Sequence, residues 1–219
     1  MEIVIDKLKV VRSGRVVLRD LDFRLQGGQA AALRGPNGVG KSTLLRTLAG
    51  LLPLAGGDVR LAGRALATDR AGLQENIAYA GHLDAVKSQL SVVENIAYWS
   101  KIYGGSAERT EESLDLLGLT SIRNRAVAEC SAGQKRRLGL ARLAVVDRPL
   151  WLLDEPTVSL DQEAVALLTS LVQRHVDAGH MALIATHVDL ALDPLHELRL
   201  TPPAHARRTE ADPFLEGAW

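Results

Sequence analysis

Gly35-Pro-Asn-Gly-Val-Gly-Lys-Ser-Thr43 is the stretch of sequence that decides the fold. It matches the phosphate-loop pattern G-x-x-x-x-G-K-[ST], in which glycines let successive backbone N–H groups turn inward around phosphates. The apolar run 29–33 before the loop predicts a buried strand, and the leucine spacing in 40–51 predicts a helix that Pro53 stops. A strand, this loop and a helix in that order predict an α/β fold that binds nucleotide phosphates.

Two side chains of the loop have specific expected roles. Lys41 would place its charge on the β- and γ-phosphates, and the Ser42 hydroxyl would bind Mg²⁺. The positive end of the following helix points at the same place. An ordinary glycine-rich turn is the alternative interpretation, and the flanking strand and helix argue against it. The loop residues expected to bind the nucleotide are Gly35, Pro36, Asn37, Gly38, Val39, Gly40, Lys41, Ser42 and Thr43.

Two carboxylates follow a second apolar run, 150–153. Such a short, wholly apolar run is typical of a central strand in a parallel sheet that is buried on both faces. At its end, Asp154 can hold the Mg²⁺ shell, as this Asp does in phosphate-loop ATPases. Glu155 can orient or deprotonate an attacking water. A solvated Asp-Glu pair at a strand end is the alternative, which the presence of the phosphate loop disfavours.

Cys130-Ser-Ala-Gly-Gln134 predicts the start of a helix. Ser131 is expected as the N-cap and Gln134 as its capping-box partner, with the basic residues 135–137 on a solvated face. A helix start with Ser and Gly at its tip is also an anion site, and the two interpretations are compatible. Cys130 is expected to be a small buried apolar residue.

The rest of the chain fits one α/β domain over residues 1–200, followed by a loosely ordered tail over 201–219. The expected parts are a core with a parallel sheet, a small antiparallel β subdomain, and a helical insertion at about 85–135. The elements expected are two or three short strands in 1–26 with a turn at Gly14, strand structure in 57–66, 76–81 and 181–185, and helices over 91–103 and 108–117.

Composition excludes several functional classes. The chain has 219 residues, with 26 basic and 26 acidic side chains, so its overall charge does not favour nucleic acid as a partner. The single cysteine excludes an internal disulfide and a multi-cysteine metal site. The first residues alternate like a strand and do not resemble a signal peptide, and no apolar run approaches the 18 or more residues that a membrane span needs. A membrane function would require a partner that supplies the membrane part.

The motifs described above occur together in one known family of ATPases. The phosphate loop, the Ser-x-Gly-Gln helix start and the Asp-Glu pair resemble, in this order and spacing, the ATP-binding-cassette (ABC) ATPases. Ser159-Leu-Asp161 is similar to the D-loop of that family, and His187, after the strand 181–185, is similar to its switch histidine. The resemblance covers about residues 1–200.

The resemblance implies an ATPase with ATP and Mg²⁺ as substrate and cofactor. Two domains of this family pair head to tail as a dimer and enclose two ATP molecules. The residues at the Ser-x-Gly-Gln helix start, called the signature, close on the γ-phosphate held by Lys41 of the other subunit. His187 contacts that phosphate. The implied catalytic residues are Lys41, Glu155 and His187; the signature and D-loop residues implied at the nucleotide are Ser131, Ala132, Gly133, Gln134 and Asp161; Ser42 and Asp154 are the implied Mg²⁺ ligands.

Three positions depart from the general family. His82 stands where a glutamine usually contacts Mg²⁺, and Ala132 replaces the first glycine of the signature. The aromatic residue that usually stacks on adenine falls near Arg12, whose guanidinium plane could take its place. Together these features resemble the haem-exporter ATP-binding subunits of cytochrome c maturation, the CcmA family.

That closer resemblance implies integral membrane permease subunits as partners. The chain would lie on the cytoplasmic face of the inner membrane and couple ATP hydrolysis to release of a haem-loaded chaperone. The alternatives are an ABC ATPase subunit for another cargo (lipid, drug or ion), a soluble ABC ATPase acting on ribosomes or DNA, and a module that binds ATP without turnover. A soluble ABC ATPase would carry tandem cassettes or a long coiled-coil insertion, and a non-hydrolysing module would lack Glu155 or His187; neither description fits.

Four aromatic residues lie close together in the sequence: Tyr79, Tyr98, Trp99 and Tyr103. Helix packing within the insertion is the favoured interpretation. A groove that receives a cytoplasmic helix of a membrane subunit, as the family implies, is the other.

Overall fold

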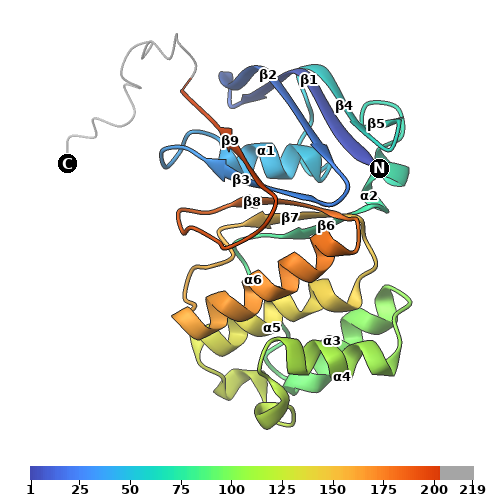
Figure 1. Cartoon of the computed structure of the whole chain (residues 1–219), viewed down its shortest axis with the longest axis vertical. Coiled ribbons are helices and arrows are strands. Elements are labelled where there is room, and N and C mark those ends of the chain that lie inside the picture. Colours follow the sequence, from blue (N-terminus) through green and yellow to red (C-terminus); the bar gives the residue numbers. More distant parts are fainter. Residues whose placement is uncertain (203–219) are drawn as a thin grey trace, which may run out of the picture.

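The computed structural model describes residues 1–202, and the predicted tail lies almost entirely outside them. An antiparallel sheet covers α1, a parallel sheet forms the middle layer, and the remaining long helices cover the far face (Figure 1). The strands are β1 (Glu2–Arg12), β2 (Arg15–Gln26), β3 (Gln29–Arg34), β4 (Gly56–Leu61), β5 (Arg64–Ala65), β6 (Ile77–Ala80), β7 (Leu150–Asp154), β8 (Met181–Ala185) and β9 (Leu195–Arg199). The helices are α1 (Lys41–Leu48), α2 (Arg70–Gln74), α3 (Val92–Ile102), α4 (Ala107–Leu116), α5 (Ala132–Val145) and α6 (Gln162–Asp177), with 3₁₀ turns η1 (Thr120–Ile122) and η2 (Val127–Glu129).

The parallel sheet has the strand order β6-β7-β8-β3-β9. Every residue of β7 is buried because alternate side chains enter two different cores. Leu150 and Leu152 pack with the leucines of α1, whereas Trp151 and Leu153 pack with α5 and α6. The prediction of a central strand buried on both faces is confirmed, and the carboxylates that follow it lie at the carboxyl edge of the sheet.

The antiparallel sheet has the order β2-β1-β4-β5. The prediction of two or three strands in residues 1–26 with a turn at Gly14 is confirmed as two strands, but their expected shortness is wrong, because β1 and β2 are long and pair through several register shifts. These irregularities bend the β1–β2 hairpin. They also shift which residues face the core, so the alternation of apolar and charged residues in the sequence is interrupted. The predicted strand over 57–66 is divided into β4 and β5 by a tight turn in which Ala62 and Gly63 both have positive φ.

The helix after the phosphate loop is shorter than the leucine spacing predicts. It ends at Leu48 with Ala49 as its C-cap, and Gly50 follows with φ 69°. A glycine in the left-handed region is the usual helix terminator, so Gly50 stops the helix before Pro53 does.

The helical insertion begins as the sequence predicts. Ser91 and Glu94 form the expected capping box at the start of α3, and a short loop connects α3 to α4. Residues 85–135 contain α3, α4, η1, η2 and the first turn of α5. Trp99 packs against this core, as the packing interpretation predicts, and stacks on Tyr103 with ring centroids 5.8 Å apart. None of the helices within residues 1–202 has the length and apolar character to span a bilayer.

A histidine lies inside the core at the opposite end of β7 from the carboxylates. The His175 ring stacks on Trp151 with centroids 3.7 Å apart and is tilted toward His180 at 4.8 Å. Burial, followed by the neighbouring His180, lowers the pKa of His175 from 6.5 to about 3. The imidazole is therefore neutral in the folded chain at neutral pH.

The lowered pKa of His175 makes the free energy of unfolding depend on pH. Its pKa is lower in the folded state, so its contribution is complete above pH 6.5 and is lost as the pH falls toward 3. The free energy of unfolding is expected to fall by up to about 1.4 kcal/mol per pH unit in that window. Denaturant titrations between pH 7 and pH 5 measure this slope, and His175→Phe should flatten it. The exposed His196 offers a control; an equal slope in His175→Phe and His196→Phe would contradict the assignment.

Candidate nucleotide site

The phosphate loop has the backbone that its sequence predicts. Gly35, Gly38 and Gly40 have φ values of 144°, 78° and 115°, which L side chains rarely adopt. Gly40 also has no room for a side chain, because an added Cβ would lie 2.8 Å from Val17 Cγ1. The contact brings β2 against the start of α1. The glycines are therefore required both by backbone conformation and by the close approach of a neighbouring strand.

Lys41 occupies the centre of the site. Its side chain is 8% exposed, and Nζ donates to Gly35 O at 3.0 Å, across the mouth of the loop. The same Nζ lies 3.1 Å from His187 Nε2 and 3.8 Å from Glu155 Oε1. The fold thus brings together three side chains that are far apart in the sequence. A buried ammonium beside one carboxylate is a site prepared for further negative charge.

Asp154 is 2% exposed, and each of its carboxylate oxygens accepts one hydrogen bond. Ser42 Oγ donates to Oδ1 at 2.9 Å, and Tyr79 Oη donates to Oδ2 at 3.2 Å. Arg46 Nε in turn donates to Tyr79 Oη at 3.4 Å. A hydroxyl and a carboxylate in direct contact beside the phosphate loop are the oxygen donors that Mg²⁺ prefers when phosphates complete its shell. The residues present fit this ion.

Tyr79 donates a hydrogen bond to Asp154, the predicted magnesium ligand, a contact that the interpretation as helix packing missed. Its position on β6, next to β7 in the sheet, is the signal that could have revealed it. Burial raises the pKa of the phenol, which remains a hydrogen-bond donor. Tyr79→Phe is expected to raise the Mg²⁺ concentration for half-maximal ATPase activity by about fivefold, corresponding to one lost hydrogen bond of about 1 kcal/mol. Tyr98→Phe, on the exposed side of α3, is the matched control, and an unchanged Mg²⁺ midpoint in Tyr79→Phe would contradict this role.

Glu155 lies one residue beyond the end of β7 and has φ 48°, an uncommon conformation for a residue with a side chain. Its backbone N–H donates to Ala185 O at 2.8 Å, which ties it to the end of β8. The Oε1 atom lies 3.5 Å from His187 Nε2. Backbone strain of this kind is concentrated at functional sites, where the surrounding structure over-determines one side-chain direction.

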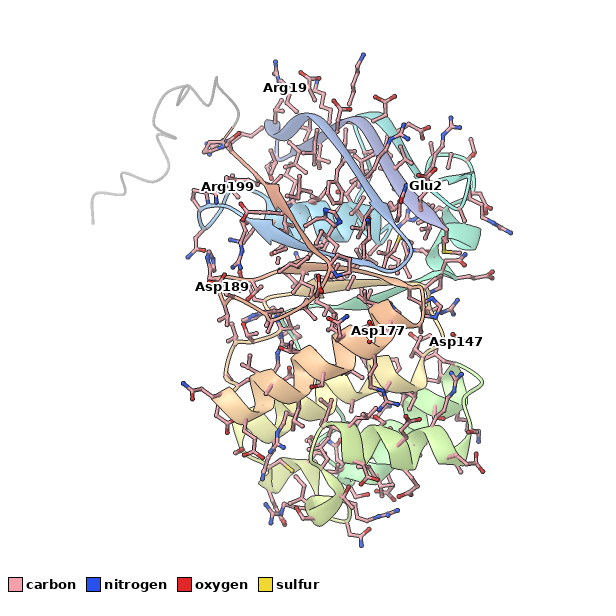
Figure 2. All side chains as sticks on the ribbon, in the orientation of Figure 1. Glu2, Arg19, Asp147, Asp177, Asp189 and Arg199 are labelled. Carbon is pink, nitrogen blue, oxygen red and sulfur yellow. The ribbon has the colours of Figure 1, made fainter. Side chains whose placement is uncertain are left out.

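His187 follows β8 and reaches across to the loop. Asn37 Oδ1 lies 2.9 Å from its Nε2 atom, so the protonation state of this nitrogen decides whether it donates to the amide or accepts from Lys41. The segment is held by Arg34, which donates to Thr186 O at 2.7 Å and to Asp189 Oδ1 at 2.6 Å. Asp189 lies at the same edge of the molecule as the phosphate loop (Figure 2).

The remaining predicted residues lie outside this cluster. Ser131 and Gln134 form the predicted capping box at the exposed start of α5, and Cys130 is buried as predicted. The Asp161 side chain caps α6 by accepting from Ala164 N at 2.8 Å. Within residues 1–202 no hydrogen bond or ion pair joins the signature residues, Asp161 or Arg12 to the phosphate loop. Arg12 is exposed at the end of β1, and Ala132 and Gly133 follow Ser131 in the first turn of α5.

One part of the prediction for this helix is wrong. The basic residues after Gln134 were expected on a solvated face, but Arg136 is only 5% exposed. Its guanidinium points inward and donates to backbone carbonyls at the end of β7 and after β6. A guanidinium has five donors and can replace water at several buried carbonyls at once, which explains its burial.

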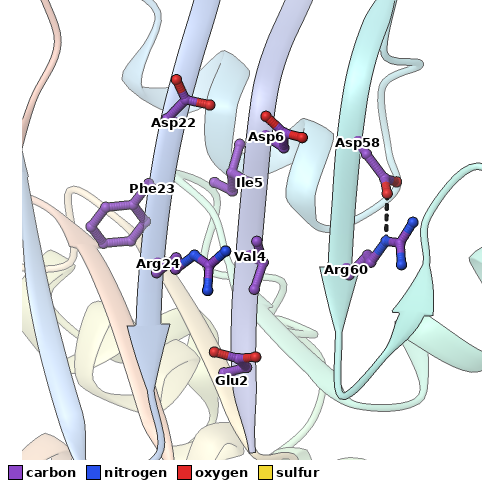
Figure 3. Close-up of a pocket in the computed structure, with 9 residues that line it drawn as sticks. All are labelled: Glu2, Val4, Ile5, Asp6, Asp22, Phe23, Arg24, Asp58 and Arg60. Atoms are coloured by element: carbon purple, nitrogen blue, oxygen red, sulfur yellow. Dashed lines mark hydrogen bonds and ion pairs between the residues drawn. The ribbon is translucent and has the colours of Figure 1, made fainter.

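A shallow groove on the outer face of the antiparallel sheet is separate from this site (Figure 3). Acidic and basic side chains alternate along it, and Arg60 Nε donates to Asp58 Oδ2 at 2.5 Å. None of the residues that line it belongs to the phosphate loop or to the cluster around Lys41. They are Glu2, Val4, Ile5, Asp6, Asp22, Phe23, Arg24, Asp58 and Arg60.

Comparison with solved structures agrees with this arrangement. An ABC transporter ATP-binding protein from Pyrococcus furiosus superposes with a TM-score of 0.80 at 22% identity, covering 91% of this chain and 98% of that one. An ATP-binding subunit of an ABC transporter superposes with a TM-score of 0.78 at 24% identity, covering 91% and 88% of the two chains. At this level of identity the likeness establishes the fold.

Sequence comparison is more specific. Residues 18–158 match the ABC transporter family. The chain is 46% identical over 202 residues to the cytochrome c biogenesis ATP-binding export protein CcmA of Cereibacter sphaeroides, covering 92% of this chain and 90% of that protein. The proteins of the same name from Rhodobacter capsulatus (48% identity; 91% and 87% covered) and Ruegeria pomeroyi (49%; 88% and 88%) are similarly close. The chain therefore belongs to the ABC transporter family and, within it, to the CcmA family of cytochrome c biogenesis ATP-binding export proteins.

Proposed function

We propose that this chain hydrolyses Mg-ATP as the ATPase subunit of a cytochrome c biogenesis exporter, where turnover drives release of a haem-loaded chaperone. The observation that carries the ATPase part is the convergence on Lys41 Nζ of the phosphate loop, Glu155 and His187, all within 3.8 Å. The exporter part is supported by relatives whose names assign them to that process.

The roles of the side chains follow from their places around Lys41. The ammonium and the inward-facing loop amides stabilise negative charge on the β- and γ-phosphates. Glu155 orients the attacking water and accepts its proton, and His187 contacts the γ-phosphate. Ser42 and Asp154 would hold Mg²⁺, which when bound would neutralise charge on the phosphate oxygens. Each of these groups lies at the carboxyl edge of the parallel sheet, where ligands bind in open α/β folds.

A second copy of the chain completes the site in this proposal. The start of α5 is exposed and, within the part of the chain that the structure describes, forms no hydrogen bond with its own phosphate loop, yet Ser131 and Gly133 at a helix N-terminus suit a phosphate. A head-to-tail dimer would bring this tip, and the neighbouring Asp161, to the nucleotide of the partner. Arg12 would stack on the adenine, because β2, its hairpin partner, already contacts Gly40.

Membrane permease subunits of the exporter are the proposed partners, with the chain held through them on the cytoplasmic face of the inner membrane. Nucleic acid is not a proposed partner, because acidic and basic residues balance at 26 each. The nucleotide-binding domain is assigned to residues 1–200, with the helical insertion at about 85–135. His82 is exposed directly after β6, next to this insertion.

A complementation experiment tests this function. Deletion of the chain in its own host should abolish assembly of c-type cytochromes, measured by haem staining of membrane proteins after denaturing electrophoresis. The wild-type chain should restore it, and Glu155→Gln, expressed at an equal level, should not. A tagged chain should also be recovered with integral membrane subunits. Normal haem attachment in the deletion strain would refute the exporter assignment and favour another cargo, while recovery with ribosomes would favour a soluble ABC ATPase.

A further inference from the structure

The Arg136 side chain, which lies outside the nucleotide cluster, donates to acceptors on two separate segments. Its Nε donates to Pro156 O at 3.2 Å, and Nη2 donates to Glu155 O at 2.7 Å and to Asp154 O at 3.3 Å. The backbone of the magnesium ligand and of the catalytic carboxylate is thus held from behind by one guanidinium. Within residues 1–202, none of the hydrogen bonds or ion pairs of Arg136 reaches Lys41 or the phosphate loop.

The other edge of the same guanidinium holds a different segment. Nη1 donates to Gly81 O at 3.1 Å, to His82 O at 3.4 Å and to Asp84 Oδ1 at 3.0 Å. Segment 81–84 follows β6 and carries the exposed Leu83 at its tip, with 81% of that residue accessible. One planar, rigid group therefore joins segment 81–84 to the backbone of Glu155.

Helix α5 makes two further contacts, one with segment 81–84 and one with the preceding strand β6. An added Cβ on Gly139 would lie 2.7 Å from Asp84 O, so only glycine permits this approach. Arg142 Nη2 donates to Tyr79 O at 3.1 Å, at the end of β6. Since α5 begins at the signature residues, its first three turns connect the signature, segment 81–84 and the carboxylate end of β7.

We propose that Arg136 is a positioning residue for ATP hydrolysis, which couples the place of segment 81–84 to the direction of the Glu155 side chain. The inference rests on the proposed ATPase activity. Glu155 has a strained backbone, and its carbonyl accepts the shortest bond that Arg136 makes, so release of that bond lets the residue relax. A carboxylate displaced by about 1 Å can lower turnover as much as a hundredfold while substrate binding is retained.

The test compares Arg136→Lys with Arg137→Lys in the full chain purified with its membrane subunits. A lysine has no fork and cannot serve acceptors on two sides, so Arg136→Lys is expected to lower kcat about tenfold and to change KM for ATP less than about twofold. Arg137 donates to Leu117 O and Gly118 O, away from β7, and Arg137→Lys should keep kcat within about twofold of wild type. A kcat of Arg136→Lys equal to that of wild type, or a KM that rises in proportion to the loss of kcat, would overturn the proposal.

Asp84→Asn provides a variant that loosens the contact from its partly exposed side, with 26% of the Asp84 side chain accessible. It is expected to lower kcat about threefold in the wild-type background. It should have no further effect in Arg136→Lys, because substitutions of two residues that share one contact are not additive. If Arg136→Lys does not fold, Asp84→Asn decides alone: an unchanged kcat overturns the proposal. Absence of Mg-ATPase activity in the wild-type complex would instead refute the proposed function, so the two failures are distinguishable.

Discussion

Glu155→Gln is expected to lower kcat for ATP hydrolysis at least about a hundredfold, the contribution of a positioned general base. The amide keeps the size of the side chain but cannot accept the proton of the attacking water. ATP binding should remain within about threefold of wild type, because the loop glycines, Lys41 and Ser42 are unchanged. Phosphate release measures the turnover, and titration with a fluorescent ATP analogue measures the binding.

Glu163→Gln is the matched control for this variant. Glu163 is an exposed carboxylate in the first turn of α6 and forms no ion pair within residues 1–202. The same chemical change at this position should leave turnover unaltered. Wild-type rates in Glu155→Gln would remove Glu155 from the catalytic role and direct attention to another base at the edge of the sheet.

Lys41→Met is expected to weaken ATP binding by about ten- to a hundredfold and to abolish measurable turnover. The side chain keeps its length but loses the charge, and a charge-assisted hydrogen bond contributes about 1.5–3 kcal/mol. Because Lys41 is buried and lies 3.8 Å from Glu155, the variant also leaves that carboxylate without its nearest cation, which opposes the approach of a triphosphate. Isothermal titration with Mg-ATP gives the affinity.

Lys101→Met, on the exposed side of α3, controls for the loss of a positive charge. Its affinity should equal that of wild type. An ATP affinity of Lys41→Met within twofold of wild type would show that the loop lysine does not contact the phosphates.

Several of the residues that the structure gathers around Lys41 could be predicted from the sequence, because local pattern and chemistry coincide there. The phosphate loop requires glycine conformations that few other motifs need, and the carboxylates end a strand whose apolar run is visible without any structure. The position of His187 could be assigned only through the family resemblance, since a lone histidine has no local signature. The structure then places it 3.1 Å from Lys41 Nζ.

Other features could not be predicted because they depend on contacts between distant segments. Arg136 belongs to a basic run that reads as a solvated helix face, and only the packing of α5 against β6 and β7 turns it inward. Tyr79 reads as one of a group of aromatics, but its register on β6 places it beside Asp154. The lengths of β1 and β2 escaped prediction because bulges shift the alternation of buried and exposed residues.

Calorimetric titration of the purified chain with ATP, in saturating Mg²⁺ and again in excess chelator, tests the central claim most directly. One nucleotide should bind per chain, more tightly with Mg²⁺ than without it, and Asp154→Asn should remove that difference. No uptake of ATP in the presence of Mg²⁺ by the folded wild-type chain would contradict it.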